Sequence, residues 1–142
     1  MALFSSDVKD AIKRLANKEF ATTEERDELL AQLADADGLR ARDVVWLLFR
    51  PDRALRDAGA KIIPRLQDPE TLEVFLAESR SKPEAAMRAA TSAFFALGLP
   101  GVGQRLVQIL TTPETKDTRD LQQAARRLVL EMPPSKGLES LL

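Results

Sequence analysis

Three segments of the sequence repeat one helical spacing of apolar residues, and this repeat constrains the fold more than any other feature. The template places apolar residues at i, i+3, i+4, i+7, i+8 and i+11, which is one face of an amphipathic helix. Small residues occupy i+3 and i+4 each time, so a neighbouring helix can approach closely there, and we expect these three helices to stack side by side through equivalent surfaces. The three copies are Leu55, Ala58, Gly59, Ile62, Ile63, Leu66, then Ala86, Ala89, Ala90, Ala93, Phe94, Leu97, and then Leu121, Ala124, Ala125, Leu128, Val129, Met132.

A shorter apolar pattern, i, i+3, i+4, follows each copy, so the repeating unit is a pair of helices. The copies start at Leu55, Ala86 and Leu121, a spacing typical of helical solenoids. A degenerate fourth copy lies over residues 23–50, where Glu25 and Arg26 replace the small pair. The shorter patterns are Leu72, Phe75, Leu76, then Leu106, Ile109, Leu110, and then Leu138, Leu141, Leu142.

Start and stop signals divide the chain into helices without any strand pattern. Thr22 and Glu25 have capping-box spacing, Pro69 and Pro83 suit first helical positions, and Pro133 must end the helix before it. These signals predict helices over residues 6–18, 23–36, 40–50, 52–66, 69–80, 84–98, 102–112, 118–132 and 136–142. We therefore expect one all-α domain over residues 1–142, with a cap over 1–22 and repeats over 23–50, 52–80, 83–112 and 118–142.

Three stretches resemble the HEAT-repeat family, in its bacterial HEAT-like form. They are the stretch from Leu55 to Leu76 (LRDAGAKIIPRLQDPETLEVFL), the stretch from Met87 to Leu110 (MRAATSAFFALGLPGVGQRLVQIL) and the stretch from Leu121 to Met132. They are similar to the family's arginine- and alanine-rich first helix, its Ala-Leu-Gly ending and its leucine-rich second helix. The resemblance implies a right-handed α-solenoid of about four helix pairs with an N-terminal capping helix. The core-type leucines of residues 138–142 are typical of a stack that continues, which suggests one domain of a longer protein.

The chain departs from the family pattern in one first helix and in the last repeat. Gly59 and Pro64 lie inside the first helix that begins near Leu55, and the last repeat lacks the Ala-Leu-Gly ending. We expect Pro64 to kink its helix after Ile63.

The amino-acid composition excludes several kinds of functional site. The 142 residues include no cysteine and no histidine, with 21 Lys and Arg against 22 Asp and Glu; this excludes disulfide scaffolds, zinc fingers, thiol nucleophiles and histidine bases. Asp35 to Gly38 lacks the later ligands of a calcium loop, and Gly98 to Gly103 has no preceding strand, so both are predicted to be turns. We predict no catalytic residue, cofactor, metal site or small-molecule substrate.

The longest apolar run, Val44 to Phe49, is too short for a membrane span, and no signal peptide is evident, which predicts a cytoplasmic protein.

The segment 40–50 carries more apolar residues than one helix face needs. Beyond its core positions, Val45, Trp46 and Phe49 are surplus. One interpretation is a helix buried on all sides, between the next repeat and the N-terminal cap. The other is an exposed patch of Trp46 and Phe49 flanked by Arg42 and Arg50, a composition enriched at protein-protein hot spots.

In the resembled family the second helices line a concave surface, which implies a ladder of side chains opposite their core positions. The ladder would contain Arg42 and Trp46, Glu70 and Val74, Gln104 and Gln108, and Lys136 and Ser140. The chain is thus predicted to be a non-catalytic interaction or scaffold module that binds a helix or an extended segment of another protein. The predicted partner-binding residues are Arg42, Trp46, Phe49, Arg50, Glu70, Val74, Gln104 and Gln108.

Two alternative functions follow from the same resemblance. HEAT-like DNA glycosylases hold DNA in a basic groove, but here Glu70, Glu73 and Glu78 interrupt the basic stripe, so nucleic acid is an unlikely partner. HEAT-like bilin lyases suggest a lyase-like enzyme subunit, although no candidate acid or base is evident.

Overall fold

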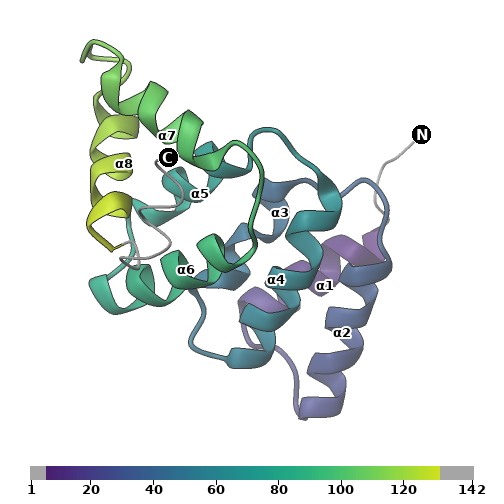
Figure 1. The fold of residues 1–142 in the computed structure, drawn as a ribbon. Coiled ribbons are helices and arrows are strands. Elements are labelled where there is room, and N and C mark those ends of the chain that lie inside the picture. The colour runs from purple at the N-terminus through teal and green to yellow at the C-terminus, as the bar shows by residue number, and fades with distance from the viewer. Residues whose placement is uncertain (1–5, 132–142) are drawn as a thin grey trace.

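The computed structural model describes residues 6–131, and within this range the chain is helical and contains no strand (Figure 1). The all-α prediction is therefore confirmed for the described residues. The predicted helix 136–142, with Lys136 and Ser140, lies outside them. The elements are α1 (Ser6–Ala16), α2 (Thr23–Asp35), α3 (Ala41–Val44), the 3-10 helix η1 (Val45–Phe49), α4 (Arg53–Leu66), α5 (Thr71–Ser79), α6 (Glu84–Ala96), α7 (Val102–Thr111) and α8 (Arg119–Glu131).

The first helices of the predicted pairs contact one another in chain order. α2 packs against α4, α4 against α6, and α6 against α8. The last helix of the described residues, α8, also packs against α7 and α5, so it contacts both members of the preceding pair and one helix of the pair before that. No helix of residues 6–131 has the length and hydropathy needed to cross a membrane.

The segment 40–50 differs from its prediction, because it is not one α-helix. It forms the short helix α3 and then tightens into η1, whose residues Val45, Leu47, Leu48 and Phe49 are buried. The elements that pack most extensively on η1 are α4, α5 and α6, whereas the interpretation of a buried helix placed it between the next repeat and the N-terminal cap. That interpretation is right for the burial of Val45, Leu47, Leu48 and Phe49, while Trp46 is only half-buried.

Gly59 of α4 faces η1 and not another first helix, which corrects the expected role of this small residue. A Cβ atom on Gly59 would lie 3.0 Å from Leu47 Cβ and 3.2 Å from Leu48 Cδ2. The missing side chain lets the backbone of α4 approach η1. Pro64 lies within α4, which continues to Leu66.

A row of aromatic rings joins η1, α5 and α6 in the core. The ring centroids of Phe49 and Phe75 are 4.9 Å apart, and those of Phe75 and Phe94 are 4.3 Å apart. Phe95 meets Phe94 edge-on at 5.8 Å. Phe75, at the middle of the row, is 0% exposed. Offset and edge contacts of this kind stabilise a core beyond simple burial.

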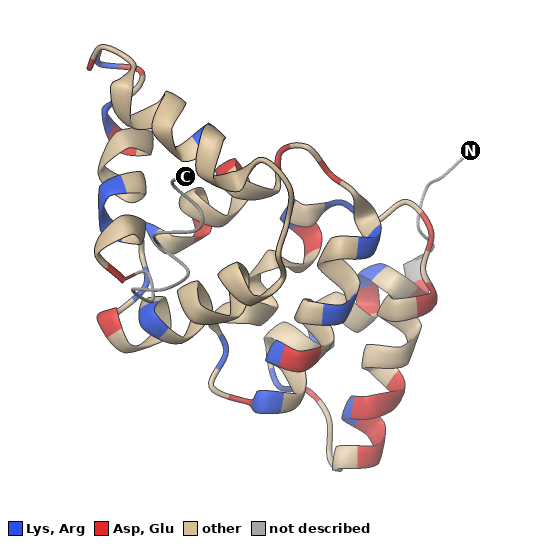
Figure 2. Ribbon diagram, in the orientation of Figure 1, with Lys and Arg blue, Asp and Glu red and all other residues tan. Residues whose placement is uncertain are grey.

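Charged residues are spread over the outer surface, with carboxylates concentrated on α2 (Figure 2). The N-terminus of α2 carries part of the predicted capping box: the Glu25 N–H donates to Thr22 Oγ1 at 3.1 Å. The other half differs, because Glu25 Oε2 accepts from the N–H of Ala21 rather than from that of Thr22. The second Glu25 oxygen pairs with Arg14 of α1, which holds the N-terminal helix against α2.

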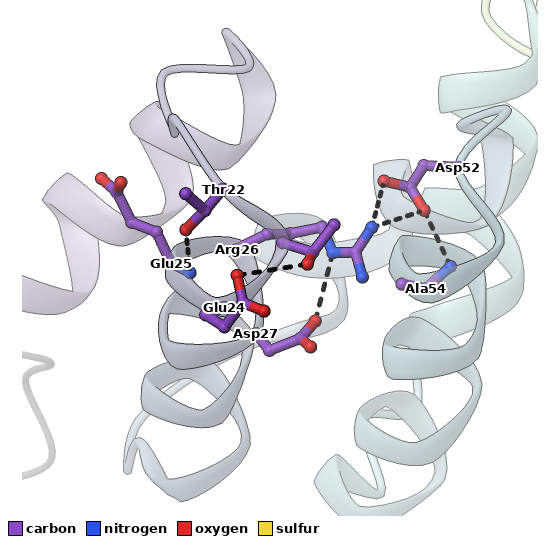
Figure 3. A network of polar contacts seen from close by, with 8 residues as sticks. Thr22, Glu24, Glu25, Arg26, Asp27, Asp52 and Ala54 are labelled. Atoms are coloured by element: carbon purple, nitrogen blue, oxygen red, sulfur yellow. Dashed lines mark hydrogen bonds and ion pairs between the residues drawn. The ribbon is translucent and has the colours of Figure 1, made fainter.

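Arg26 joins the N-termini of α2 and α4 (Figure 3). Its Nη1 lies 3.2 Å from Asp52 Oδ2, and its Nε lies 3.1 Å from Asp27 Oδ1. Asp52 in turn caps α4, because its Oδ1 accepts from the Ala54 N–H at 2.9 Å. Glu25 and Arg26, which replace the small pair in this repeat, therefore hold α2 to both of its neighbours through ion pairs.

Arginines also donate to carbonyl groups at or near the C-terminal ends of helices. Arg127 of α8 donates to the carbonyl of Ser79, the last residue of α5, at 3.0 Å, and to that of Lys82, in the connection after α5, at 2.6 Å. Arg65 of α4 donates to the carbonyl of Ala34 in the last turn of α2 at 3.2 Å. The last carbonyls of a helix lack partners within it, and a cation there is favourable.

Candidate protein-interaction site

Trp46 is half-buried and is held by two local contacts. Its indole Nε1 donates to the Asp43 carbonyl at 2.8 Å, and the Arg50 guanidinium lies 4.9 Å from the ring centroid. Arg42 is exposed. The indole therefore presents part of its surface beside a cation, an arrangement favoured by cation-π attraction.

Phe49 does not belong to an exposed patch with Trp46, which corrects the second interpretation of this segment. Its side chain is only 6% exposed and stacks on Phe75. α5 packs directly on η1 and covers the Phe49 ring with apolar surface. Of the predicted patch, only Arg42, Trp46 and Arg50 remain accessible to a partner.

Truncating Arg50 is expected to expose the indole of Trp46. The chain has one tryptophan and no tyrosine, so its fluorescence reports this side chain alone. Arg50→Ala should shift the emission to longer wavelength and increase quenching by acrylamide, because the guanidinium no longer covers the ring. Arg42→Ala is the matched control and should leave both unchanged. Equal spectra for Arg50→Ala and the wild type would contradict the observed stacking.

The predicted partner-binding residues at α5 and α7 differ in how far they are exposed. Glu70, Gln104 and Gln108 are exposed, whereas Val74 is half-buried. Val107, also on α7, is 41% exposed, which is unusual for a large apolar side chain among the described residues. α7 thus has a buried side, with Leu106 and Ile109, and an exposed side that no other described element covers.

Arg105 links α7 to α5 by side-chain contacts. Its Nε pairs with Glu73 Oε1 on α5, and its Nη1 donates to Gln108 Oε1 at 3.2 Å. Through Arg105, Gln108 of α7 is linked to Glu73 of α5. Arg105 itself was not predicted, because only positions opposite the core pattern were considered. Its signal in the sequence is a basic residue about one repeat beyond an acidic one, Glu73.

Asp68 links α3 to the start of α5. Its Oδ2 accepts from the Ala41 N–H at 3.0 Å, and its Oδ1 accepts from the Glu70 N–H at 2.9 Å. Partial burial is the largest single influence and raises the pKa of Asp68. The two hydrogen bonds, with the charges of Arg40 and Arg42, outweigh it and hold the pKa below its ordinary value of 3.8. Asp68 therefore holds the first residue of α3 beside the N-terminus of α5.

Replacing Asp68 by asparagine is expected to lower the free energy of unfolding by about 1 to 2 kcal/mol at neutral pH, since one accepting oxygen is lost. The folded pKa is lower than the unfolded pKa, so ionised Asp68 stabilises the fold at all pH values above about 4. This stabilisation is lost as the pH falls through the folded pKa.

Urea unfolding of the wild type and Asp68→Asn as a function of pH measures this effect. The gap between the two should be constant near neutrality and should narrow below about pH 4. Asp57→Asn is the control, because Asp57 is exposed and its ion pair with Arg53 spans 3.7 Å. A gap that does not change with pH would contradict the assigned role of the carboxylate.

No group of three or more Asp or Glu side chains within residues 6–131 is arranged to hold a metal ion. Comparisons with models of protein families, with curated proteins and with solved structures find no match to this chain. The candidate site is therefore defined by its own geometry: the accessible residues of α3 and η1, the exposed sides of α5 and α7, and Asp68 and Arg105, which link these elements.

Proposed function

We propose that the chain is a non-catalytic protein-interaction module that binds a helix or an extended segment of another protein. The binding surface is the exposed side of α7 with the half-buried residues Glu73 and Val74 of α5. Arg42, Trp46 and Arg50 extend it. The observation that carries the proposal is the fixed row formed by Glu73, Arg105 and Gln108 across two helices, with the apolar side chain of Val107 exposed on α7. A surface ordered in this way loses little side-chain entropy when a partner binds.

We also propose that this module is a HEAT-like, right-handed solenoid. The support comes from the successive contacts of α2, α4, α6 and α8, and from the residues that these helices share. Ala90 and Ala125 occupy equivalent positions of the repeat and are both 0% exposed. In such a stack the second helices form a continuous surface, and large surfaces of stacked repeats commonly bind partner proteins.

The chemistry of the surface suits a polypeptide. The amides of Gln104 and Gln108 both donate and accept hydrogen bonds, which matches the alternating groups of a partner backbone. Val74 and Val107 add apolar contact area. The charge of Arg105 is already paired with that of Glu73, so the surface offers a weak attraction to a polyanion.

A peptide selection tests the proposal. Random peptides displayed on phage are selected on the whole chain, and the affinities of the selected peptides are measured by fluorescence anisotropy. The double variant Gln104→Ala and Gln108→Ala is expected to bind them about tenfold more weakly, a loss of about 1.4 kcal/mol. The control replaces two exposed glutamines elsewhere, Gln32→Ala and Gln123→Ala, and should bind as the wild type does. Selected peptides that bind both double variants equally would refute this surface.

A further inference from the structure

A cavity of about 420 Å³ lies between two equivalent connections of the fold, the one from α4 to α5 and the one from α6 to α7. Ile63 and Leu72 are buried at this place, and the half-buried side chains of Leu97, Leu99 and Val102 also line the cavity. Its walls are therefore mainly apolar. Its size is at the lower end of the range of sites that hold small ligands, which leaves room for one large side chain with its adjoining backbone.

The cavity is continuous with the proposed interaction surface. Arg105 lines it and also bonds to Glu73 and Gln108, the row that joins α5 and α7. A polypeptide bound along α5 and α7 can thus insert a side chain into the cavity without leaving the surface. This continuity favours a polypeptide as the occupant.

The charged residues near the cavity indicate which charge a partner residue next to the inserted side chain should carry. Arg105 is balanced by Glu73, and Asp68 lies between two N–H donors with Arg40 and Arg42 on its α3 side. Glu70 does not itself line the cavity, but it lies between Pro69 and Thr71, which do, and its exposed carboxylate makes no ion pair or hydrogen bond with the other described residues. The connection from α4 to α5 contains Asp68 and Glu70 and no basic residue, and it carries red segments in Figure 2. A cation in the partner complements this edge.

We propose that the cavity takes one apolar side chain of a partner polypeptide, and that a lysine or arginine next to it in the partner pairs with Glu70. This inference rests on the proposed function, since it names the chemistry of the partner that binds there. According to this inference, the chain recognises an apolar residue with a basic residue next to it in the partner.

Capped tetrapeptides test the inference directly. The chain is labelled with ¹³C at the methyl groups of Ile, Leu and Val and is titrated with N-acetyl-Gly-Leu-Arg-Gly-amide. The methyl signals of Leu97, Leu99 and Val102 should shift and saturate with a millimolar Kd. The peptide with glutamate in place of arginine should bind about three- to fivefold more weakly. The peptide with alanine in place of leucine should give no saturable shift at these methyl groups.

Reversing the charge of Glu70 distinguishes specific recognition of the peptide from nonspecific binding. Glu70→Lys should reverse the preference between the arginine and glutamate peptides, whereas Glu28→Lys, at an exposed carboxylate of α2, should preserve it. Equal affinity of the wild type for both peptides, or no saturable shift up to about 10 mM, overturns the inference.

The pattern of shifts also distinguishes this inference from the proposed function. Shifts confined to the methyl groups of Val74 and Val107 overturn the cavity and leave the α5 and α7 surface in place. Shifts at the cavity, with selected peptides that are insensitive to Gln104 and Gln108, keep the cavity and overturn that surface.

Discussion

Phe75→Ala is expected to lower the free energy of unfolding by about 3 to 5 kcal/mol, the typical effect of truncating a buried phenylalanine. The side chain of Phe75 is 0% exposed and lies between the rings of Phe49 and Phe94. Its removal leaves a cavity where η1, α5 and α6 meet, and the surrounding helices can close it only in part. A loss of this size is a large fraction of the total stability of an ordinary domain.

Urea unfolding followed by far-UV circular dichroism measures the effect, and Phe75→Leu adds a second point. Leucine restores much of the volume but not the ring stacking, so its loss should be about 1 to 2 kcal/mol. Leu130→Ala is the control: Leu130 is 84% exposed, and its truncation should change stability by less than about 0.5 kcal/mol. A similar loss for Phe75→Ala and Leu130→Ala would show that the aromatic row does not hold the three elements together.

Helix positions were largely predictable from the sequence because local signals determine them. Thr22 caps α2 and Asp52 caps α4, and the glycines of the connection between α6 and α7 adopt left-handed conformations, with φ of 64° at Gly98 and 78° at Gly101. Such signals act over a few residues and can be read without knowing the tertiary contacts. The exact first residue of a helix is less predictable: Pro83 is the N-cap of α6 rather than its first residue, and Pro69 precedes Glu70, the N-cap of α5.

The path of residues 40–50 could not be predicted, because tertiary packing decides it. A continuous α-helix satisfies the local pattern, but the chain tightens into η1 where α4, α5 and α6 converge. The burial of Phe49 follows from Phe75, a residue of the next helix pair. The excess of apolar residues in the segment is visible in the sequence, but the sequence does not show which helices pack over them.

The candidate site was predictable in part for the same reason. Of the residues that the helical register places opposite the core positions, Gln104 and Gln108 are exposed on α7, Glu70 is exposed just before α5, and Val74 is half-buried. The register does not predict which charges meet across helices, so Arg105 was missed. The link made by Asp68 was not predicted, because its partners are the backbone N–H groups of Ala41 and Glu70. Backbone groups are the same in nearly all residues, so the sequence does not indicate which of them Asp68 contacts.

Gly59→Leu is expected to lower the free energy of unfolding by about 2 kcal/mol, although leucine is the better helix former by almost 1 kcal/mol. A Cβ at this position lies 3.0 Å from Leu47 Cβ, an atom fixed to the backbone of η1, so α4 and η1 must separate. Overpacking of this kind typically costs about 1 to 3 kcal/mol, and here it outweighs the gain in helix propensity.

Ala89→Leu is the matched control for this substitution, because Ala89 is exposed on α6 and occupies the other small position of its repeat. It should leave the urea midpoint unchanged or raise it slightly. If Gly59→Leu is as stable as the wild type, the close approach of α4 to η1 is wrong. Gly59 would then serve the contact between first helices that the repeat originally suggested, and Ala90→Leu should be the more destabilising change.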